Sequence, residues 1–462
     1  MKNRILSLMI ALTLLLPFLT ACESTDTPST SGGNTSGKTA QSSVQNTEGS
    51  EEVNATETEP DYSWFEMPEE TDTLTIYGYS FYDNTLREAI DLFETKYPYV
   101  KVDYQRLGEE EYTERLRAEI PAGRGPDVFF GEPSVLPDIY KTMSTGIFTD
   151  LAPYMECDEE CSPSDYFENV LKGGIMFEKQ YLLPLTIGLN LYITTENILA
   201  ENGIEPDSLQ TWEGFLNAGT VFHENNPDKP LISWDGKQYY IGMLFKGCGF
   251  RLIDYENNAI SFDETRFRQI FELSRLYCYP KQPADLTYGD EVNELTRGDC
   301  LFINAGKSNV LLLTNKYWSL RNKNKQKPIL VCIPNKEDGV SAQILNYAAI
   351  PEASQNKMNA WRFIKILLSP ELQGDKIQGT FATAYPVGLS VNKESALAML
   401  SAAGLDDIIA LMNKITDAVM LPPVISGYIS QYMVPYITSN DGSNYDKQFG
   451  QLMNALELYK DE

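Results

Sequence analysis

One stretch of the chain alternates between two hydrophobic periodicities, and this alternation constrains the fold more than any other feature of the sequence. Residues 73–77 and 100–104 place apolar side chains at every second position, which predicts two strands. Residues 84–97 and 110–120 place them three or four positions apart, which predicts helices, and a third strand follows at 128–130. This order predicts an α/β fold with a parallel sheet covered on both faces.

Helical periodicity and short apolar runs continue to the carboxyl end of the chain. The later helical patterns cover residues 211–221, 263–276, 359–368, 395–416 and 448–460. The chain has 462 residues, more than the roughly 250–300 at which a single hydrophobic core stops growing. The sequence therefore predicts two α/β lobes rather than one domain.

The amino terminus has the features of a bacterial export signal. Lys2 and Arg4 precede an apolar run from Ile5 to Phe18, and Leu19-Thr20-Ala21-Cys22 follows. The tetrapeptide resembles the lipobox of bacterial lipoproteins, which implies that residues 1–21 are removed and that Cys22 carries a lipid. The run is shorter than the about 20 apolar residues of a membrane-spanning helix. An ordinary secretory signal with an incidental cysteine is the alternative.

A polar, acidic segment separates this signal from the first predicted strand. We expect residues 22–70 to be the lipidated cysteine and a disordered tether, because larger aliphatic side chains are scarce there. Between Glu23 and Asp72 there are twelve acidic residues and one basic residue, Lys38. The whole chain carries a net charge of −28, which repels phosphate backbones. The charge of the chain therefore argues against nucleic acid as a partner.

The sequence contains little of the machinery that catalysis requires. His223 is the single histidine, and its place near the end of a predicted helix favours a solvated or capping role. Nucleophile-elbow, phosphate-loop and dinucleotide glycine patterns are missing from the sequence. We therefore expect no enzyme activity, no cofactor and no metal site. Hydrolysis of a glycoside by two carboxylates remains an open alternative, since 65 acidic residues make chance pairs inevitable.

Six cysteines follow Cys22, and export from the cytoplasm permits disulfides among them. Cys157 and Cys161 lie in a polar segment at a spacing of four, which allows a bridge if the segment makes a helical turn. We expect this pair to form a disulfide. The other four cysteines lie in or near apolar runs and are expected to be buried thiols.

A series of short motifs follows one order along the folded part of the chain. They are Leu86–Glu94, Tyr97-Pro98, Ala122–Val128, Gly146–Leu151, Tyr181–Pro184, Thr211–Phe215, Gly298–Gly306 and Ala360–Gln373. In this order they resemble the extracellular solute-binding proteins of family 1, the maltose-binding-protein-like receptors of ABC importers. The resemblance covers nearly everything after the tether.

This resemblance implies a two-lobed, periplasmic-binding-protein-like (type II) fold whose discontinuous lobes are joined by a hinge. The expected first lobe is residues 71–185 plus 301–354, and the second is residues 186–300 plus 355–462. The implied function is a monomeric receptor, lipid-anchored at the outer face of the bacterial cytoplasmic membrane. It would capture a small polar solute, a sugar or oligosaccharide, and deliver it to ABC permease subunits. A sensor partner without transport is a further alternative.

Ligands of open α/β sheets lie beyond the carboxyl ends of the strands, here residues 78–83 and 131–132. Aromatic faces pack on sugar C–H groups, while carboxylates and amides bind hydroxyls. The candidate ligand residues of these kinds are Tyr79, Phe81, Tyr82, Glu132, Asn190, Trp234, Trp318 and Tyr385. Where the family has Gly-Pro-Trp, this chain has Ala305-Gly306-Lys307, so a stacking tryptophan is replaced. Lys307 would favour an anionic solute if it faces the cleft.

Overall fold

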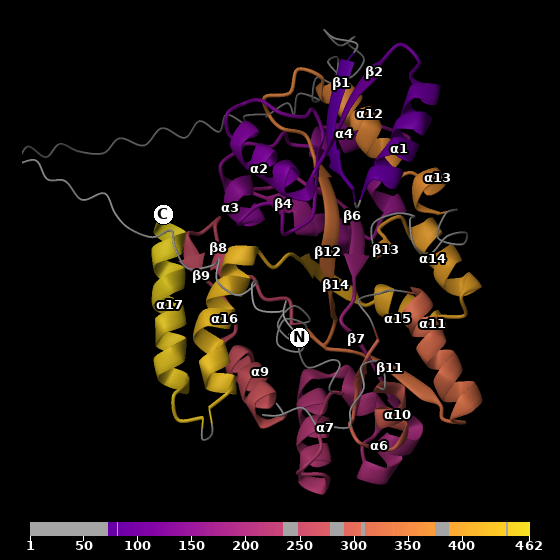
Figure 1. Cartoon of the computed structure of the whole chain (residues 1–462), viewed down its shortest axis with the longest axis vertical. Helices are drawn as coiled ribbons and strands as arrows, with labels where there is room; N and C mark the ends of the chain where they lie inside the picture. Colours follow the sequence, from indigo (N-terminus) through magenta and orange to yellow (C-terminus); the bar gives the residue numbers. More distant parts are fainter. Residues whose placement is uncertain are drawn as a thin grey trace, which may run out of the picture. The chain divides into compact units, whose positions relative to one another are not determined.

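The computed structural model describes eight stretches of the chain. They are residues 73–80, 82–233, 248–277, 291–305, 310–335, 337–374, 388–439 and 442–462. Every element described below belongs to the unit of residues 61–462. Figure 1 shows these elements coloured along the sequence.

The predicted alternation of strands and helices at the start of this unit is confirmed. β1 (Thr73–Tyr79) and β2 (Lys101–Leu107) are parallel neighbours joined by α1 (Asp83–Lys96). The apolar positions of α1 explain why it forms there, because Leu86, Ala89, Ile90 and Phe93 form one buried face. α2 (Glu109–Glu119) then leads to β3 (Phe129–Gly131), and a parallel bridge joins Ile76 of β1 to Val128.

The predicted parallel arrangement is confirmed for β1, β2 and Val128, which directly precedes β3, but the central sheet that β3 joins is mixed. Its longest strand is β12 (Val340–Ala349), which pairs antiparallel with β3 and with β6 (Leu183–Gly188). β13 (Leu389–Ser390) adds to β6 antiparallel, and β14 (Ile415–Val419) runs parallel to the first half of β12. Periodicity could not reveal this, because strand direction depends on partners more than 150 residues away in the chain.

A second sheet follows directly on β6. β7 (Leu191–Thr195) lies between β10 (Ile303–Asn304) and β11 (Pro328–Cys332), and it pairs antiparallel with both. Only Leu189 and Asn190 separate β6 from β7 in the chain. The chain therefore passes from the central sheet into the second sheet at Asn190, beside β12 (Figure 1).

The helices cover these sheets, and most of the predicted ones are present. α7 (Trp212–Asn225), α9 (Glu264–Tyr277), α12 (Lys357–Leu368) and α17 (Tyr445–Asp461) match their predicted ranges within a few residues. The expected helix at 395–416 is wrong as a single element. It divides into α14 (Lys393–Ala402), α15 (Asp406–Met412) and the start of β14, because Gly404 has a left-handed φ of 66° that ends the first helix.

The remaining elements are short, apart from one helix near the carboxyl end. They are α3 (Ile139–Ser144), α4 (Ala152–Cys157), α5 (Glu168–Leu171), β4 (Ile175–Met176), β5 (Lys179–Gln180), α6 (Glu196–Asn202), β8 (Ile253–Asp254), β9 (Ala259–Ile260), α10 (Glu291–Thr296), α11 (Val310–Trp318), α13 (Pro370–Gln373) and α16 (Pro423–Ile437). None of the helices in the described stretches is long and apolar enough to cross a membrane.

α12 packs on α1, and this contact bears on the lobe boundaries expected from the sequence. The rings of Phe93 and Phe363 lie 5.6 Å apart, and Trp361 is fully buried. The expected boundaries place α12 in the second lobe, whereas α1 belongs to the first. The packing favours a first lobe that also contains residues 357–368, and the boundaries as a whole stay a prediction.

Candidate functional site

The carboxylate of Glu132 is the centre of a hydrogen-bonded cluster at the strand ends named above. Glu132 directly follows β3, Tyr79 ends β1, and Tyr82 directly precedes α1. The hydroxyl of Tyr82 donates to Glu132 Oε2 at 2.9 Å, and that of Tyr79 donates to Oε1 at 3.3 Å. Ser134 Oγ also donates to Oε1, at 2.6 Å. The structure thus brings together three residues that the sequence analysis singled out.

Two residues that the sequence analysis missed extend this cluster into the central sheet. Asn346 of β12 donates from Nδ2 to the Tyr82 hydroxyl oxygen at 2.8 Å. Thr186 of β6 donates from Oγ1 to Asn346 Oδ1 at 2.9 Å. Both side chains are buried, so these bonds satisfy polar groups that water cannot reach. The sequence signal that could have revealed Asn346 was the presence of an amide side chain within the apolar run from Ile344 to Ile350.

Burial and charge keep the two tyrosines in their donor form. Removal from water raises the pKa of Tyr79 above its ordinary value, and the negative charge of Glu132 raises it further. The same two causes, in the same order, raise the pKa of Tyr82. Both phenols therefore remain protonated at physiological pH and donate to Glu132.

A cavity of about 440 Å³ opens beside this cluster. It is lined by Tyr82, Glu132, Pro133, Ser134, Gln343, Ile344, Leu345, Asn346, Val419, Met420, Leu421, Pro423 and Ser426. The lining combines hydroxyl, amide and carboxylate groups with aliphatic side chains. Within this described lining, Glu132 is the one side chain that carries a charge at neutral pH. Such a surface suits a small molecule with hydroxyl groups and apolar C–H faces.

Asn190 reaches the cavity indirectly. Gln343, which lines the cavity, donates from Nε2 to Asn190 Oδ1 at 2.5 Å. Asn190 is 1% exposed, and its Nδ2 has no hydrogen-bond partner among the described residues. Gln343 is a second residue of β12 that the sequence analysis missed.

Of the other predicted ligand residues, Trp318 is the one that lies in the described part of the chain. Trp318 ends α11 with 56% of its surface exposed, and the ammonium of Lys323 lies 5.8 Å from its ring centre. Trp318 is not part of the cavity lining. Phe81, Trp234, Lys307, Tyr385 and the expected lipidation site Cys22 lie outside the described residues.

The expected disulfide between Cys157 and Cys161 is not formed in the structure, where both are free thiols. Cys157 ends α4 and is partly exposed, whereas Cys161 is buried and its Sγ lies 3.5 Å from the hydroxyl of Tyr166. Burial raises the pKa of the Cys161 thiol to about 11, so this cysteine is protonated at neutral pH. The bond in the exported protein stays a prediction.

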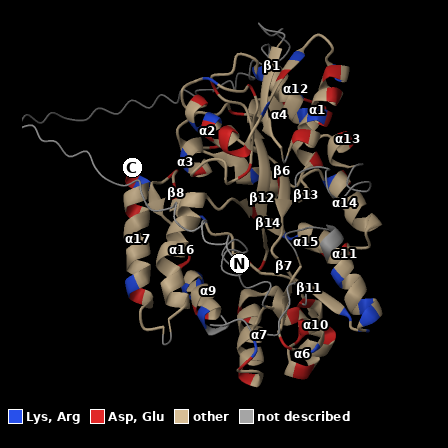
Figure 2. Cartoon of the chain, in the orientation of Figure 1, with Lys and Arg blue, Asp and Glu red and all other residues tan. Residues whose placement is uncertain are grey.

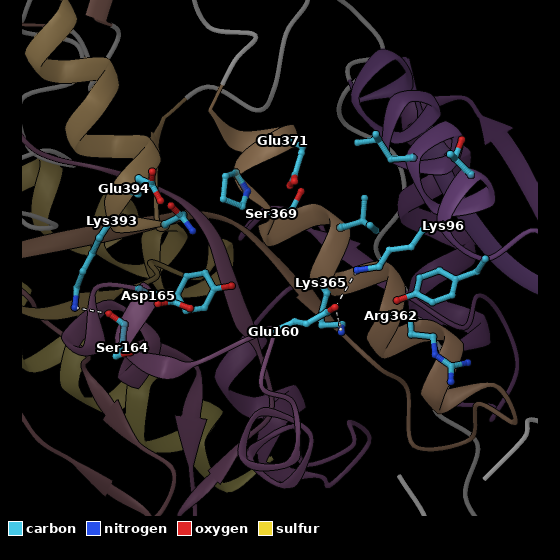
Figure 3. A pocket seen from close by; sticks show the side chains of 17 residues that line it. Lys96, Glu160, Ser164, Asp165, Arg362, Lys365, Ser369, Glu371, Lys393 and Glu394 are labelled. Carbon is cyan, nitrogen blue, oxygen red and sulfur yellow. Dashed lines mark hydrogen bonds and ion pairs between the residues drawn. The ribbon is translucent and has the colours of Figure 1, made fainter. Parts of the chain in front are cut away.

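A larger hollow of about 920 Å³ lies elsewhere, between α1, α12 and the start of α14 (Figure 3). Its lining is strongly charged, but several of these charges are already paired. Lys96 and Lys365 both contact Glu160, at 2.9 and 3.0 Å, and Lys365 also contacts Asp158 at 2.7 Å. This hollow contains none of the predicted ligand residues. We therefore take the smaller cavity as the candidate site.

Groups suited to catalysis or metal binding do not gather at this cavity. His223 lies in α7 and is not part of the cavity lining. In the stretches that the structure describes, no three His, Cys, Asp or Glu side chains are placed to hold a metal ion. The chemistry that the described lining offers is hydrogen bonding and apolar contact.

Three of the solved structures that are similar to this chain are named for sugar or saccharide binding. The sugar-binding protein MalE from the phytopathogen Xanthomonas citri is 16% identical, with a TM-score of 0.60 over 84% of this chain and 97% of that chain. The periplasmic oligogalacturonide binding protein from Yersinia enterocolitica is 16% identical, with a TM-score of 0.57 over 83% and 99%. The cyclic alpha-maltosyl-1,6-maltose binding protein from Arthrobacter globiformis is 14% identical, with a TM-score of 0.57 over 84% and 98%.

These likenesses show that the fold is the type II periplasmic-binding-protein fold, as the sequence predicts. The sequence itself matches the model of a protein family over residues 82–374, which is more than half of the chain. The matched range contains Tyr82, Glu132, Gln343 and Asn346, which are polar residues of the cavity lining. The chain therefore belongs to the bacterial extracellular solute-binding protein family.

Proposed function

We propose that this protein is an extracytoplasmic receptor that captures a sugar or oligosaccharide and delivers it to an ABC importer. The observation that carries the proposal is the cavity beside Glu132, whose lining combines hydroxyl, amide and carboxylate groups with aliphatic side chains. The three similar structures support the sugar class, because each is named for a saccharide or for sugar binding.

The hydrogen-bond count at Glu132 supports a ligand that donates a hydrogen bond. A carboxylate has about four acceptor positions on its two oxygens. Oε1 accepts from Tyr79 and Ser134, and Oε2 accepts from Tyr82. One acceptor position on Oε2 is therefore left for a donor from the solute. A sugar hydroxyl supplies such a donor, and its ring C–H groups suit the wall formed by Val419, Met420 and Leu421.

We propose binding without turnover. The family is one of solute-binding proteins, and hydrolysis of a glycoside generally uses two carboxyl groups about 5–10 Å apart. The described lining of the cavity offers one carboxyl group, that of Glu132. Release of a shortened saccharide that stops in Glu132→Gln would contradict this part of the proposal.

We further propose that the receptor is a monomer anchored at the outer face of the cytoplasmic membrane through a lipid on Cys22. The lipobox-like tetrapeptide and the acidic segment that follows it support this location. A lipid anchor would keep the receptor close to its permease, which raises the effective concentration of one for the other.

A thermal-shift screen tests the proposed solute class. The probes are maltotriose, trigalacturonate, glutamate and spermidine, which represent neutral sugars, acidic sugars, amino acids and polyamines. A ligand at 100 times its dissociation constant stabilises the folded state by about 2.7 kcal/mol, so the Tm should rise by several degrees. We expect a saccharide to do this. A shift with glutamate or spermidine and with neither saccharide would contradict the sugar assignment.

A further inference from the structure

α3 contacts three segments that lie far from it in the sequence. The turn after β8, the residues before α16 and the carboxyl end of α17 are bonded to α3 or to its cap residue Asp138 at one edge of the structure (Figure 1). The loop that leads into α3 contains Pro133 and Ser134, which line the cavity beside Glu132. α3 therefore stands at the rim of the candidate site. By the expected boundaries, α3 belongs to the first lobe and its three neighbours belong to the second.

Asp138 is the most buried charged residue of this rim, with 3% of its surface exposed. Its Oδ1 caps α3 by accepting from the backbone N–H groups of Tyr140 and Lys141, at 3.0 and 3.2 Å. Its Oδ2 accepts from the hydroxyl of Tyr255 at 2.6 Å. Tyr255 directly follows β8. The carboxylate therefore joins its own helix to the hairpin of the other predicted lobe.

Two more residues of the same helical turn make bonds of the same kind. Lys141 Nζ donates to the backbone oxygen of Tyr459 in α17 at 2.7 Å and lies 4.2 Å from the centre of its ring. The hydroxyl oxygen of Tyr140 accepts from the backbone N–H of Met420 at 2.9 Å. The guanidinium of Arg251 lies 4.7 Å from the centre of the Tyr140 ring. These contacts tie α3 to three separate parts of the chain.

These bonds lie directly beside the cavity. Met420 itself lines it, and the next residues begin α16, where the N–H of Val424 donates to the oxygen of Pro137 at 3.3 Å. If the two predicted lobes separate to admit a solute, the bonds made by Asp138, Tyr140 and Lys141 must break together. The inference rests on the proposed function, because these bonds would break in a receptor whose lobes open and close around a solute.

We propose that Asp138, Tyr140 and Lys141 form a rim latch with Tyr255, Met420 and Tyr459, and that this latch sets how often the solute cavity opens. A hydrogen bond to a buried carboxylate is stronger than one between neutral groups, and the burial of Asp138 keeps water from competing for it. Loss of the Tyr255 hydroxyl should therefore increase the open population on the order of tenfold. The latch would regulate the same site that binds the solute.

Hydrogen exchange of the full chain without any solute tests the latch. The amide hydrogens of Met420 and Val424 are themselves bonded across the rim, so their exchange reports its opening directly. Tyr255→Phe removes one hydroxyl and keeps the ring. We expect it to accelerate exchange of these two amides on the order of tenfold. Lys141→Met, which removes the bond to α17, should act in the same direction.

Tyr104→Phe is the matched control. The hydroxyl of Tyr104 donates to Asp83 Oδ1 at 2.9 Å, so the variant also removes a tyrosine–carboxylate bond, but one within the first predicted lobe. We expect the exchange of Met420 and Val424 to stay unchanged in this variant. Equal rates in Tyr255→Phe and Tyr104→Phe would overturn the latch, as would an acceleration in Tyr255→Phe that extends equally to β1 and β12.

The two proposals can fail separately. The exchange experiment contains no solute, so a negative result removes the latch and leaves the thermal-shift test of solute binding untouched. A screen in which no saccharide binds removes the sugar assignment and leaves the exchange rates of Met420 and Val424 interpretable.

Discussion

Asn346 links two hydroxyl groups, that of Thr186 in β6 and that of Tyr82, which directly precedes α1. It accepts from Thr186 and donates to Tyr82, which in turn donates to Glu132. The hydrogen bonds run in one direction, because each group in the series donates to the next one. Glu132 therefore receives a donor whose orientation is set from within the sheet.

Substitution of the two tyrosines tests this arrangement at the level of single atoms. Tyr82→Phe removes a donor to Glu132 and leaves Asn346 Nδ2 without its acceptor in a buried site. We expect the free energy of unfolding to fall by about 1–3 kcal/mol and the affinity for the solute to fall as well. Urea unfolding and calorimetry with the probe identified in the screen measure these two changes.

Tyr79→Phe serves as the comparison for Tyr82→Phe. Tyr79 also donates to Glu132, but at the longer distance of 3.3 Å, and Asn346 does not depend on it. We expect it to lose less stability and less affinity. The directional chain of bonds is wrong if the Tyr79 variant is the more damaged of the two.

Among the elements, α12 is held to its neighbours by one tryptophan and one lysine. The indole N–H of Trp361 donates to Asp158 Oδ2 at 2.8 Å, and the ammonium of Lys365 contacts the same oxygen at 2.7 Å. Glu160 then joins Lys365 to Lys96 of α1, as the dashed lines of Figure 3 show. These contacts fix α12 beside α1.

The charge of Glu160 gives this packing a dependence on pH. Hydrogen bonds from Lys96 and Lys365 lower the pKa of Glu160 from its ordinary value of 4.5 to about 2. A carboxyl whose pKa is lower in the folded state stabilises that state above the unfolded pKa, and the contribution disappears as the pH falls toward the folded pKa. The Glu160 side chain is 62% exposed, so solvent screens the pair and the contribution stays below about 1 kcal/mol.

Glu160→Gln tests this pH dependence. We expect the wild type to exceed the variant in free energy of unfolding by a constant amount above pH 4.5, and the difference to vanish as the pH approaches 2. High salt should shrink the difference at every pH. Glu371→Gln, in the same hollow but outside these ion pairs, is the control. Urea unfolding across this pH range provides the measurement, and a difference that grows toward low pH would contradict it.

At the scale of the whole molecule, charged side chains lie on several helices, whereas two strands of the central sheet carry none. β6 and β12 carry no Lys, Arg, Asp or Glu, whereas α1, α2 and α17 carry both signs (Figure 2). The net charge of −28 favours solubility and does not by itself mark a ligand.

The proposed anchor is also a property of the whole chain. Cys22→Ala should release the protein from membranes into the medium, because the lipid on this cysteine would be its attachment. Fractionation of cells followed by detection of the protein measures the change. Lys38→Ala, in the polar segment that follows, is a control that should leave the protein with membranes. Retention of the cysteine variant on washed membranes would show that the attachment is a different one.

Part of the site was predictable from sequence because it depends on local order. Tyr79, Tyr82 and Glu132 meet because strands β1 and β3 are close in sequence and joined by regular crossovers, so their carboxyl ends fall at one edge. Gln343 and Asn346 were missed, because their places beside the cavity depend on the pairing of β12 with distant strands. Asn346 pairs with β6, more than 150 residues earlier, and Gln343 pairs with β14, which follows later in the chain. No local pattern records such a pairing.

The sequence by itself determined the class of the fold, the order of its first strands and helices, and the family of the protein. These follow from periodicity and from motifs that each span only a few residues. The tertiary structure alone decided the direction of β12, the division of the helix expected at 395–416, and the contacts between α3 and α17. The physical reason is that burial and hydrogen bonding between distant segments choose among conformations that local periodicity leaves equally acceptable.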